Sequence, residues 1–570
     1  MAKEEQTISS PSSSKEELPV ILEGMRSGKT DGIKELQELL SRHPDCVEVM
    51  GHLAWALAHK GGYESAIRIY RKYLEIQPEN FEVRWMMGDR LVNLGRLDEA
   101  FQVYKGVLND HPDCMDARTG VRYVEYLRST KTKGEKPYSY PQKSLTQLQE
   151  ENLNLNRREF KQNQMRLKSL PSQLYLESTT KCNFYCRTCN KGYGAYYAED
   201  LQRDILDKVK SEIMPRVCRI SITGFGEPTM SAHFDEILNM AIQNGSHVHF
   251  VTNSSLLNFR RLEQLTRSHV EIQISLDGAT RETVEDIRTG SHFDQICERL
   301  AMIKKLRDIN LSEFYTIFSL LFVALKKNIH ELPDVVRLAH RYRINGVGVM
   351  DYAYIFRAFD EQALRFDPER ANHYMQEARK VAEELGVDLD LPPTYSIEAL
   401  PLPSASLWNK IKAAKHLFPF PNRIPQLCYS PWMEPYIHTD GLVHPCCTSR
   451  EYMGNLKEKP FRDIWNGWRY RLLRYRIHSI LPSPWCRGCH VSWGINGGNP
   501  GNIMAQEGLL VKIFYFCENR FRRLLDIIST LPAKMGFNKK KCVAMSPNFF
   551  QGRPLVETEN KSEESKGGAL

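Results

Sequence analysis

Six short runs rich in β-branched residues alternate with helical stretches between residues 174 and 350 of this 570-residue chain. The runs are Leu174–Thr179, Cys218–Thr223, His247–Thr252, Val270–Leu276, Tyr315–Val323 and Gly346–Met350. Strands that are separated by helices in this way form a parallel sheet with right-handed connections. We therefore predict an α/β domain with its sheet curved or closed into a partial (β/α)6 barrel. Its working residues should lie at the carboxyl ends of the strands.

Three cysteines directly follow the first predicted strand. Cys182, Cys186 and Cys189 have the spacing CxxxCxxC. Because the N-terminal segment lacks the apolar stretch of a secretory signal, we expect a cytoplasmic protein, where close cysteine spacings indicate metal or redox chemistry. Four-iron clusters ordinarily take four cysteines, so three leave one iron open, as catalytic metal sites leave one position open. A zinc site is the alternative, although a local fourth ligand is lacking.

Glycine and polar residues stand at the ends of the next three strands. They are Gly224, Gly226 and Glu227 after the second strand, Asn253 after the third, and Ser275 and Asp277 after the fourth. The glycines let the backbone approach a ligand closely, and Glu227 offers an acceptor for an ammonium group. The hydroxyl and carboxylate of Ser275 and Asp277 suit a ribose. Each motif alone is weak, since a strand-end aspartate often only caps a helix, but their order along successive strands is specific.

This combination resembles the radical S-adenosylmethionine (radical SAM) superfamily between Pro171 and Leu391. The resemblance implies that the three cysteines bind a [4Fe–4S] cluster whose open iron chelates the amine and carboxylate of SAM. It also implies that the glycine motif with Glu227 holds the amine, and that Ser275 and Asp277 lie near the ribose and carboxylate. Asn253 and Arg288 are further candidates for SAM binding, with a helix cap and a surface charge as the alternatives. Thr188 departs from the family, which often places an aromatic ring there against the adenine.

The resemblance implies a radical reaction. The cluster is reduced by one electron, SAM is cleaved, and a 5′-deoxyadenosyl radical abstracts a hydrogen atom from the substrate. The cofactor breaks the bonds while the protein orients the reactants and excludes water and oxygen. No catalytic residue beyond the cluster is implied, and reduced ferredoxin or flavodoxin is the expected electron donor.

A second group of cysteines follows a proline-rich hinge. The spacing of Cys428, Gly441 and Cys446 indicates a hairpin that turns at Asp440-Gly441 with a thiolate on each side. Cys486 and Cys489 follow as a CxxC pair. Four cysteines in two pairs complete an iron–sulfur cluster, and on spacing alone a structural zinc site is an equal alternative.

Together with Gly454-Asn-Leu and Asp463-Ile-Trp-Asn466, these cysteines resemble the auxiliary-cluster module SPASM in its shortened, twitch form. The full module carries more cysteines and a further cluster. The four matching residues imply one auxiliary [4Fe–4S] cluster, with Cys428, Cys446, Cys486 and Cys489 as ligands. Because these ligands leave no iron open, we expect the cluster to relay electrons. Cys447 is an extra thiol, either an alternative ligand to Cys446 or a buried residue.

The N-terminal region repeats at an interval of 34 residues. The repeated positions include Pro44, Pro78 and Pro112, then Gly61 and Gly95, Ala66 and Ala100, and Tyr70 and Tyr104. The pattern resembles the tetratricopeptide repeat (TPR), with a worn copy from about Glu17 to His43 and a capping helix from Asp113 to about Ser129. Such a solenoid either docks a peptide or protein partner, or serves as a spacer or lid for the next domain.

We therefore predict a multidomain chain: an α-helical TPR solenoid, an α/β partial barrel of radical SAM type, and a small cysteine-rich α+β SPASM/twitch domain. The expected boundaries are 1–16 for a disordered leader, 17–130 for the repeats, 131–170 for a linker with one exposed helix, 171–395 for the radical SAM core, 396–500 for the SPASM/twitch domain, 501–535 for an amphipathic basic helix and 536–570 for a disordered tail.

The net charge of +8 is concentrated near the C-terminus, where residues 509–541 carry eight Lys and Arg against two acidic residues. Proteins that bind nucleic acid concentrate basic charge on their folded body, so we expect no nucleic-acid partner. No apolar stretch is long enough for a transmembrane helix. The basic amphipathic helix either contacts an anionic membrane surface or packs against the preceding domain.

The favoured function is a radical SAM enzyme that acts on a peptide or protein. The alternatives are a radical SAM dehydrogenase or methyl-transferring enzyme for a small molecule, a TPR scaffold with a vestigial cluster domain, and a zinc-containing binding protein. Retention of the three triplet cysteines together with Glu227 and Asp277 argues against decay. The substrate stays open, because one fold supports many reactions.

Overall fold

One ten-stranded sheet organises the chain. The computed structural model describes residues 14–27, 29–133, 144–189, 198–266, 268–310, 314–351, 361–392, 394–395, 428–447, 449, 451–477 and 486. Within them the strand order is β10-β9-β8-β1-β2-β3-β4-β5-β6-β7. The predicted basic helix at 501–535 and the predicted tail at 536–570 lie outside the described residues.

The six predicted strands are present and pair in parallel, each with the next along the chain. They are β1 Gln173–Leu176, β2 Arg219–Ile222, β3 His247–Thr252, β4 Val270–Ser275, β5 Ile317–Ala324 and β6 Gly346–Asp351. The short strand β7, Asp388–Asp390, pairs in parallel with β6 and lengthens the sheet. The predicted α/β class of this region is confirmed.

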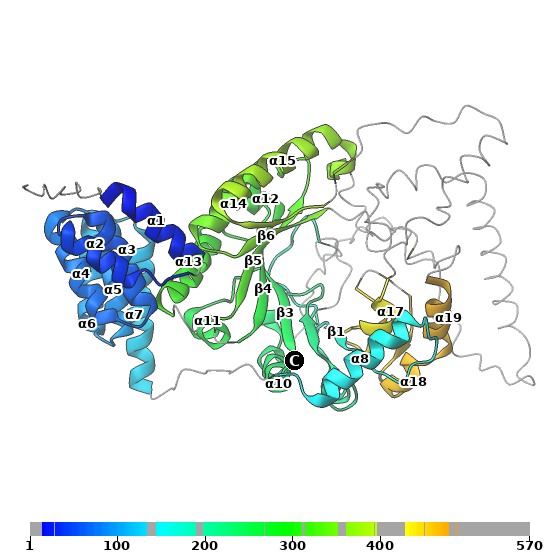
Figure 1. Ribbon diagram of the computed structural model, residues 1–570. Coiled ribbons are helices and arrows are strands. Elements are labelled where there is room, and N and C mark those ends of the chain that lie inside the picture. The colour runs from blue at the N-terminus through cyan, green and yellow to red at the C-terminus, as the bar shows by residue number, and fades with distance from the viewer. Residues whose placement is uncertain are drawn as a thin grey trace, which may run out of the picture. The chain divides into compact units, whose positions relative to one another are not determined.

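Helices follow the strands and cover one face of the sheet (Figure 1). They are α9 Arg203–Lys208, α10 Phe234–Gln243, α11 Phe259–Thr266, α12 Arg281–Ile287, α13 Phe293–Ile309, α14 Leu332–Arg341 and α15 Pro368–Leu385. Strand β5 alternates in burial: Phe318, Leu320 and Phe322 are fully buried in the main apolar core, whereas the residues between them are half-buried. This period of two gives the sheet an apolar face toward the helices and a second, more polar face.

The cysteine-rich region adds three strands to the other edge of the same sheet. Strand β8, Tyr436–Ile437, pairs in parallel with β1, and β9, Leu442–His444, pairs antiparallel with β8. Strand β10, Gly454–Asn455, completes the edge. Gly441 has φ +84° in the turn between β8 and β9, which is the predicted hairpin and requires the left-handed conformation that glycine adopts easily. The short helices α17 Ser430–Met433, α18 Phe461–Trp465 and α19 Trp468–Ile477 accompany these strands.

Helix α8, Gln147–Lys161, differs from the exposed linker helix that its polar composition predicts. Gln149, Asn152 and Asn156 on this helix are buried, and each donates a hydrogen bond to a main-chain carbonyl. Asn156 Nδ2, for example, lies 2.6 Å from the Trp432 carbonyl oxygen. Amide side chains can be buried when they satisfy backbone groups in this way, so α8 joins the barrel to the cysteine-rich region.

Seven helices form the N-terminal region: α1 Ser14–Arg26, α2 Ile33–Arg42, α3 Val47–His59, α4 Tyr63–Ile76, α5 Phe81–Asn93, α6 Leu97–Asp110 and α7 Met115–Lys133. The repeated alanines and tyrosines are buried, as the repeat predicts. Gly88 and Gly120 lie against Tyr104, where an added Cβ would come within 2.6 Å of the ring. Small residues on α5 and α7 therefore make room for the large repeated residue on α6.

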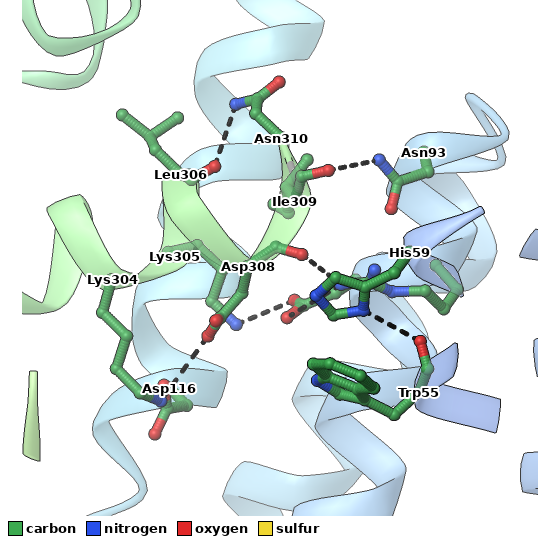
Figure 2. Close-up of polar contacts among 12 residues, drawn as sticks. Trp55, His59, Asn93, Asp116, Lys304, Lys305, Leu306, Asp308, Ile309 and Asn310 are labelled. Atoms are coloured by element: carbon green, nitrogen blue, oxygen red, sulfur yellow. Dashed lines mark hydrogen bonds and ion pairs between the residues drawn. The ribbon is translucent and has the colours of Figure 1, made fainter. Parts of the chain in front are cut away.

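The repeats pack against helix α13 of the barrel through a buried polar network (Figure 2). Lys305 of α13 is fully buried, with its Nζ 2.8 Å from Asp89 Oδ1 on α5. Tyr104 donates to the same oxygen at 2.5 Å. Asn93 and Arg90 donate to the main-chain carbonyls of Ile309 and Asp308 at the end of α13. The repeats therefore contact the next domain, as a spacer or lid would, and this contact leaves open whether they also dock a partner.

Among the helices of the described residues, none is both long and apolar enough to cross a bilayer.

Candidate functional site

The three cysteines of the triplet lie in a loop that follows β1, and the structure brings them together. All three are half-buried, and Cys182 and Cys189 lie close enough to Cys186 for their charges to raise its pKa. Two main-chain hydrogen bonds anchor the loop. Tyr185 N donates to the Thr289 carbonyl at 2.9 Å, and Arg187 N donates to the Ile287 carbonyl at 2.8 Å. The segment that ends α12 therefore holds the cysteine loop in place.

Nitrogen atoms lie near two of the three sulfur atoms of this loop. Phe184 N donates to Cys182 Sγ at 3.4 Å, and Asn253 Nδ2 lies 3.8 Å from the same atom. Arg288 Nη1 lies 4.0 Å from Cys186 Sγ. Burial raises the pKa of the Cys186 thiol to about 11, and the Arg288 charge opposes this shift. Donors aimed at sulfur suit thiolates that bind iron, since such hydrogen bonds tune iron–sulfur clusters.

The glycine motif packs directly on the chain that leads into the cysteine loop. Glu227 N donates to the Lys181 carbonyl at 2.7 Å. A Cβ at Gly226 would lie 2.3 Å from the Thr179 carbonyl oxygen and 2.6 Å from that of Lys181, and both atoms belong to the backbone. Only glycine permits this close approach. Two motifs that are about 40 residues apart in the sequence thus form one site.

Glu227 is buried, and its carboxylate has an uneven set of partners. Oε1 accepts hydrogen bonds from the hydroxyls of Thr229 and Thr252 at 2.5 and 2.7 Å. Oε2 accepts from Asn253 N at 2.6 Å. Burial raises the pKa of Glu227, and these hydrogen bonds oppose the shift. Because a carboxylate oxygen can accept two hydrogen bonds, Oε2 has capacity for one more donor, such as an ammonium group.

The carboxylate of Asp277 is engaged inside the protein. Its Oδ1 accepts from Val323 N at 2.8 Å, and its Oδ2 lies 2.9 Å from Arg288 Nε. By resemblance Asp277 lies near the ribose of SAM, whereas its contacts show that it holds the Arg288 side chain beside Cys186. Ser275 is buried at the end of β4, two residues before Asp277.

The downstream cysteines are placed in part. Cys428, Cys446 and Cys486 are half-buried and Cys447 is exposed, whereas Cys489 lies outside the described residues. Ser449 N donates to Cys446 Sγ at 3.3 Å, so this thiol also has an amide donor. Nowhere in the described part of the chain do three Cys, His, Asp or Glu side chains converge closely enough for a single metal ion.

Sequence reasoning misses a second buried carboxylate beside the glycine motif. Glu177 follows β1, is 1% exposed, and accepts hydrogen bonds from Phe225 N, Tyr436 and His438. A charged residue at the end of an apolar strand is a signal that could have found it. His438 and His444 flank the predicted hairpin turn, and their contact with each other has no comparable signal.

Comparison with known protein families explains this arrangement. Residues 176–339 match the radical SAM superfamily. The chain contains a radical SAM domain. Residues 428–490 match the iron–sulfur cluster-binding domain SPASM, and residues 27–81 and 57–119 match tetratricopeptide repeats. The family resemblances stated from the sequence are confirmed.

Curated relatives share the radical SAM region at low identity. The tungsten-containing aldehyde ferredoxin oxidoreductase cofactor-modifying protein of Pyrococcus furiosus is 25% identical over 55% of this chain and 86% of its own length. The mycofactocin maturase MftC of Mycobacterium tuberculosis is 28% identical over 35% of this chain, which spans about half of that protein (51%). Among solved structures, Streptococcus suis SuiB bound to its precursor peptide SuiA is 18% identical, covers 63% of this chain and 78% of its own, and has a TM-score of 0.42.

Radical SAM and SPASM domains bind SAM and iron–sulfur clusters. The prediction that this chain uses SAM and [4Fe–4S] clusters is therefore confirmed. The described residues fit them. Three cysteines in one loop, two of which have nitrogen donors at their sulfur atoms, suit a cluster, and the further acceptor capacity of Glu227 Oε2 suits the amine of SAM.

Proposed function

We propose that this radical SAM enzyme binds its SAM-cleaving [4Fe–4S] cluster through Cys182, Cys186 and Cys189, and that it modifies a peptide or protein. The observation that carries the site assignment is the contact between the cysteine loop and the glycine motif, in which Glu227 N donates to the Lys181 carbonyl. This contact supports the proposal, because it joins the residue proposed to accept the amine to the segment directly before Cys182.

When bound, the cluster and SAM would supply the radical chemistry that removes a hydrogen atom from the substrate. The chain's residues bind and orient these groups. Glu227 accepts the SAM amine, and Arg288, held by Asp277, places a positive charge beside Cys186. Asn253 joins the glycine motif to the cysteine loop, because its main-chain nitrogen donates to Glu227 Oε2 and its side-chain Nδ2 donates to Asn183 Oδ1. We assign Gly224, Gly226 and Ser275 to the same SAM site.

The SPASM region is proposed to hold one auxiliary [4Fe–4S] cluster through Cys428, Cys446, Cys486 and Cys489. A cluster with four protein ligands has no open iron for the substrate, so its role is to relay electrons. Reduced ferredoxin or flavodoxin is the proposed electron donor for the enzyme.

Two observations favour a peptide or protein substrate. The repeats belong to a family of protein-interaction modules. One relative is a maturase and another modifies the cofactor of a protein. Protease treatment of a cell extract tests this choice, because it should abolish the extract's stimulation of SAM cleavage. Stimulation by a protease-resistant, low-molecular-mass fraction would favour a small molecule.

The assignment as a radical SAM enzyme with two four-iron clusters is tested on the full chain, purified and reconstituted without oxygen. We expect about eight irons with matching sulfide for two four-iron clusters, and formation of 5′-deoxyadenosine after addition of dithionite and SAM. Cys186→Ala should lose about half of the iron and all SAM cleavage. Cys114→Ala is a matched control, because Cys114 is a half-buried cysteine among the repeats. Zinc without sulfide, or SAM cleavage that survives Cys186→Ala, would overturn the proposal.

A further inference from the structure

Glu177 connects two parts of the protein that are far apart in the sequence. On one side its Oε1 accepts a hydrogen bond from Phe225 N, at 3.0 Å, inside the glycine motif. On the other side Oε1 accepts from the Tyr436 hydroxyl at 3.2 Å, and Oε2 pairs with His438 Nδ1 at 3.0 Å. Both partners on that side belong to the β8–β9 hairpin of the SPASM region.

The glycine motif rests directly on this carboxylate. A Cβ at Gly224 would lie 2.5 Å from Glu177 Cγ and 2.6 Å from Oε1. Gly224 itself is exposed, so one side of the loop faces solvent while the other side contacts Glu177. A shift of the Glu177 side chain would therefore move the backbone of residues 224–226, which leads into Glu227.

The hairpin fixes Glu177 from the opposite side. Main-chain bonds align the two strands, since Glu177 N donates to the Ile437 carbonyl at 2.9 Å. His438 Nε2 lies 3.2 Å from His444 Nδ1 on β9. If both imidazoles are neutral and His438 Nδ1 donates to Glu177, then His438 Nε2 must accept a hydrogen from His444 Nδ1. His438 thus connects the Glu177 carboxylate to His444 on the next strand of the hairpin.

We propose that Glu177 is a positioning residue for SAM, and that the SPASM hairpin, through Tyr436 and His438, is a structural part of the SAM site. The carboxylate transmits the position of the hairpin to the loop that holds the SAM amine. This inference rests on the proposed function, in which Gly224, Gly226 and Glu227 bind that amine. It makes SAM affinity depend on residues that lie more than 200 positions further along the chain.

Equilibrium dialysis with labelled SAM tests the proposal on the anaerobically reconstituted full chain, with iron content measured in parallel. Tyr436→Phe removes one donor and should weaken SAM binding about fivefold, the effect of one lost hydrogen bond. Glu177→Ala should weaken it at least about tenfold, while Glu177→Gln, which still accepts from Phe225 N, should stay within about threefold of wild type. Thr439→Ala is the matched control: Thr439 is buried in the same hairpin, but its hydroxyl donates to Glu199.

The double variant separates positioning from general stability. In the Glu177→Ala background, Tyr436→Phe should change SAM affinity no further, because the two residues act through one contact. Independent, additive losses would overturn the inference, as would Tyr436→Phe and Glu177→Ala proteins that keep their iron and bind SAM like wild type. Should Glu177→Ala lose iron, the Tyr436→Phe and Thr439→Ala pair decides alone. Wild-type protein that holds iron but binds no SAM would instead refute the proposed function.

Discussion

Replacing Lys305 by methionine should loosen the contact between the repeats and the barrel. The side chain is fully buried, its Nζ is 2.8 Å from Asp89 Oδ1, and it lies over the rings of Trp85 and Tyr104 at 4.6 and 5.2 Å. Methionine has similar length, so the change leaves little empty volume. Its main effect is to leave the Asp89 carboxylate buried without its closest positive partner.

Removing one member of a buried ion pair typically costs about 3–5 kcal/mol. Here Arg90 Nη2 lies 4.0 Å from Asp89 Oδ2 and Tyr104 still donates to Oδ1, so we expect about 3 kcal/mol, the lower end of that range. The double variant Asp89→Asn/Lys305→Met should recover most of this loss, because a neutral amide can still accept from Tyr104 and no unpaired charge remains.

Hydrogen exchange of the amides in α5, α7 and α13 measures the local free energy of opening. The Lys305→Met protein should exchange faster there, and the double variant should resemble wild type. Burial raises the pKa of Asp89, and the Lys305 and Arg90 charges oppose this shift. An aspartate with a raised folded-state pKa stabilises the protein at low pH and loses that contribution as pH rises. Lys305→Met should therefore come closest to wild type at low pH, and a double variant as unstable as the single one would refute the reasoning.

Three further predictions concern other parts of the chain. Gly226→Ala should abolish SAM binding in equilibrium dialysis while the iron content stays high, because the added Cβ would meet two backbone oxygens within 2.6 Å. A SAM affinity equal to that of wild type would contradict the packing described. Gly88→Ala should lower the stability of the repeats by about 2 kcal/mol through its clash with Tyr104. Gly106→Ala, with open space around its Cβ in helix α6, should stabilise them by about 0.5–1 kcal/mol in the same thermal denaturation assay; equal effects of the two changes would count against the Tyr104 contact. Burial raises the pKa of Glu434 to about 7, against the opposing effects of its Ser430 hydrogen bond and the Arg219 charge. A folded-state pKa above the ordinary 4.5 means that wild type loses stability as pH rises toward 7. The difference in melting temperature between wild type and Glu434→Gln should therefore change between pH 5 and pH 8, and a constant difference would show that Glu434 does not titrate in this range.

The sequence predicts those features that depend on local patterns. The six strands follow from β-branched runs, and the hairpin follows from Asp440-Gly441, because strand formation and tight turns are governed by neighbouring residues. The closeness of the cysteine loop and the glycine motif follows from parallel topology, which brings the carboxyl ends of the strands to one edge.

The contacts that sequence reasoning misses join distant segments. Glu177 and Tyr436 are 259 positions apart, and neither residue type indicates that the other is its hydrogen-bond partner. Lysine is usually exposed to solvent on helices, and Lys305 is buried only because α5 brings Asp89 against it. Likewise, the polar side chains of α8 are buried because main-chain carbonyls accept their hydrogen bonds. Tertiary partners determine all three cases, and a single sequence does not reveal which segments meet.

The pairing of β8 with β1 limits how this protein can be divided. A fragment that ends before residue 428 would leave Tyr175 N and Glu177 N without their acceptors, the carbonyls of Pro435 and Ile437. Strand β1 would then become an unprotected edge, and such edges recruit strands from other molecules. We therefore expect that removing residues 428–570, about a quarter of the chain, yields aggregates in place of a minimal catalytic unit, and that any shortened version must retain at least one strand to cover β1.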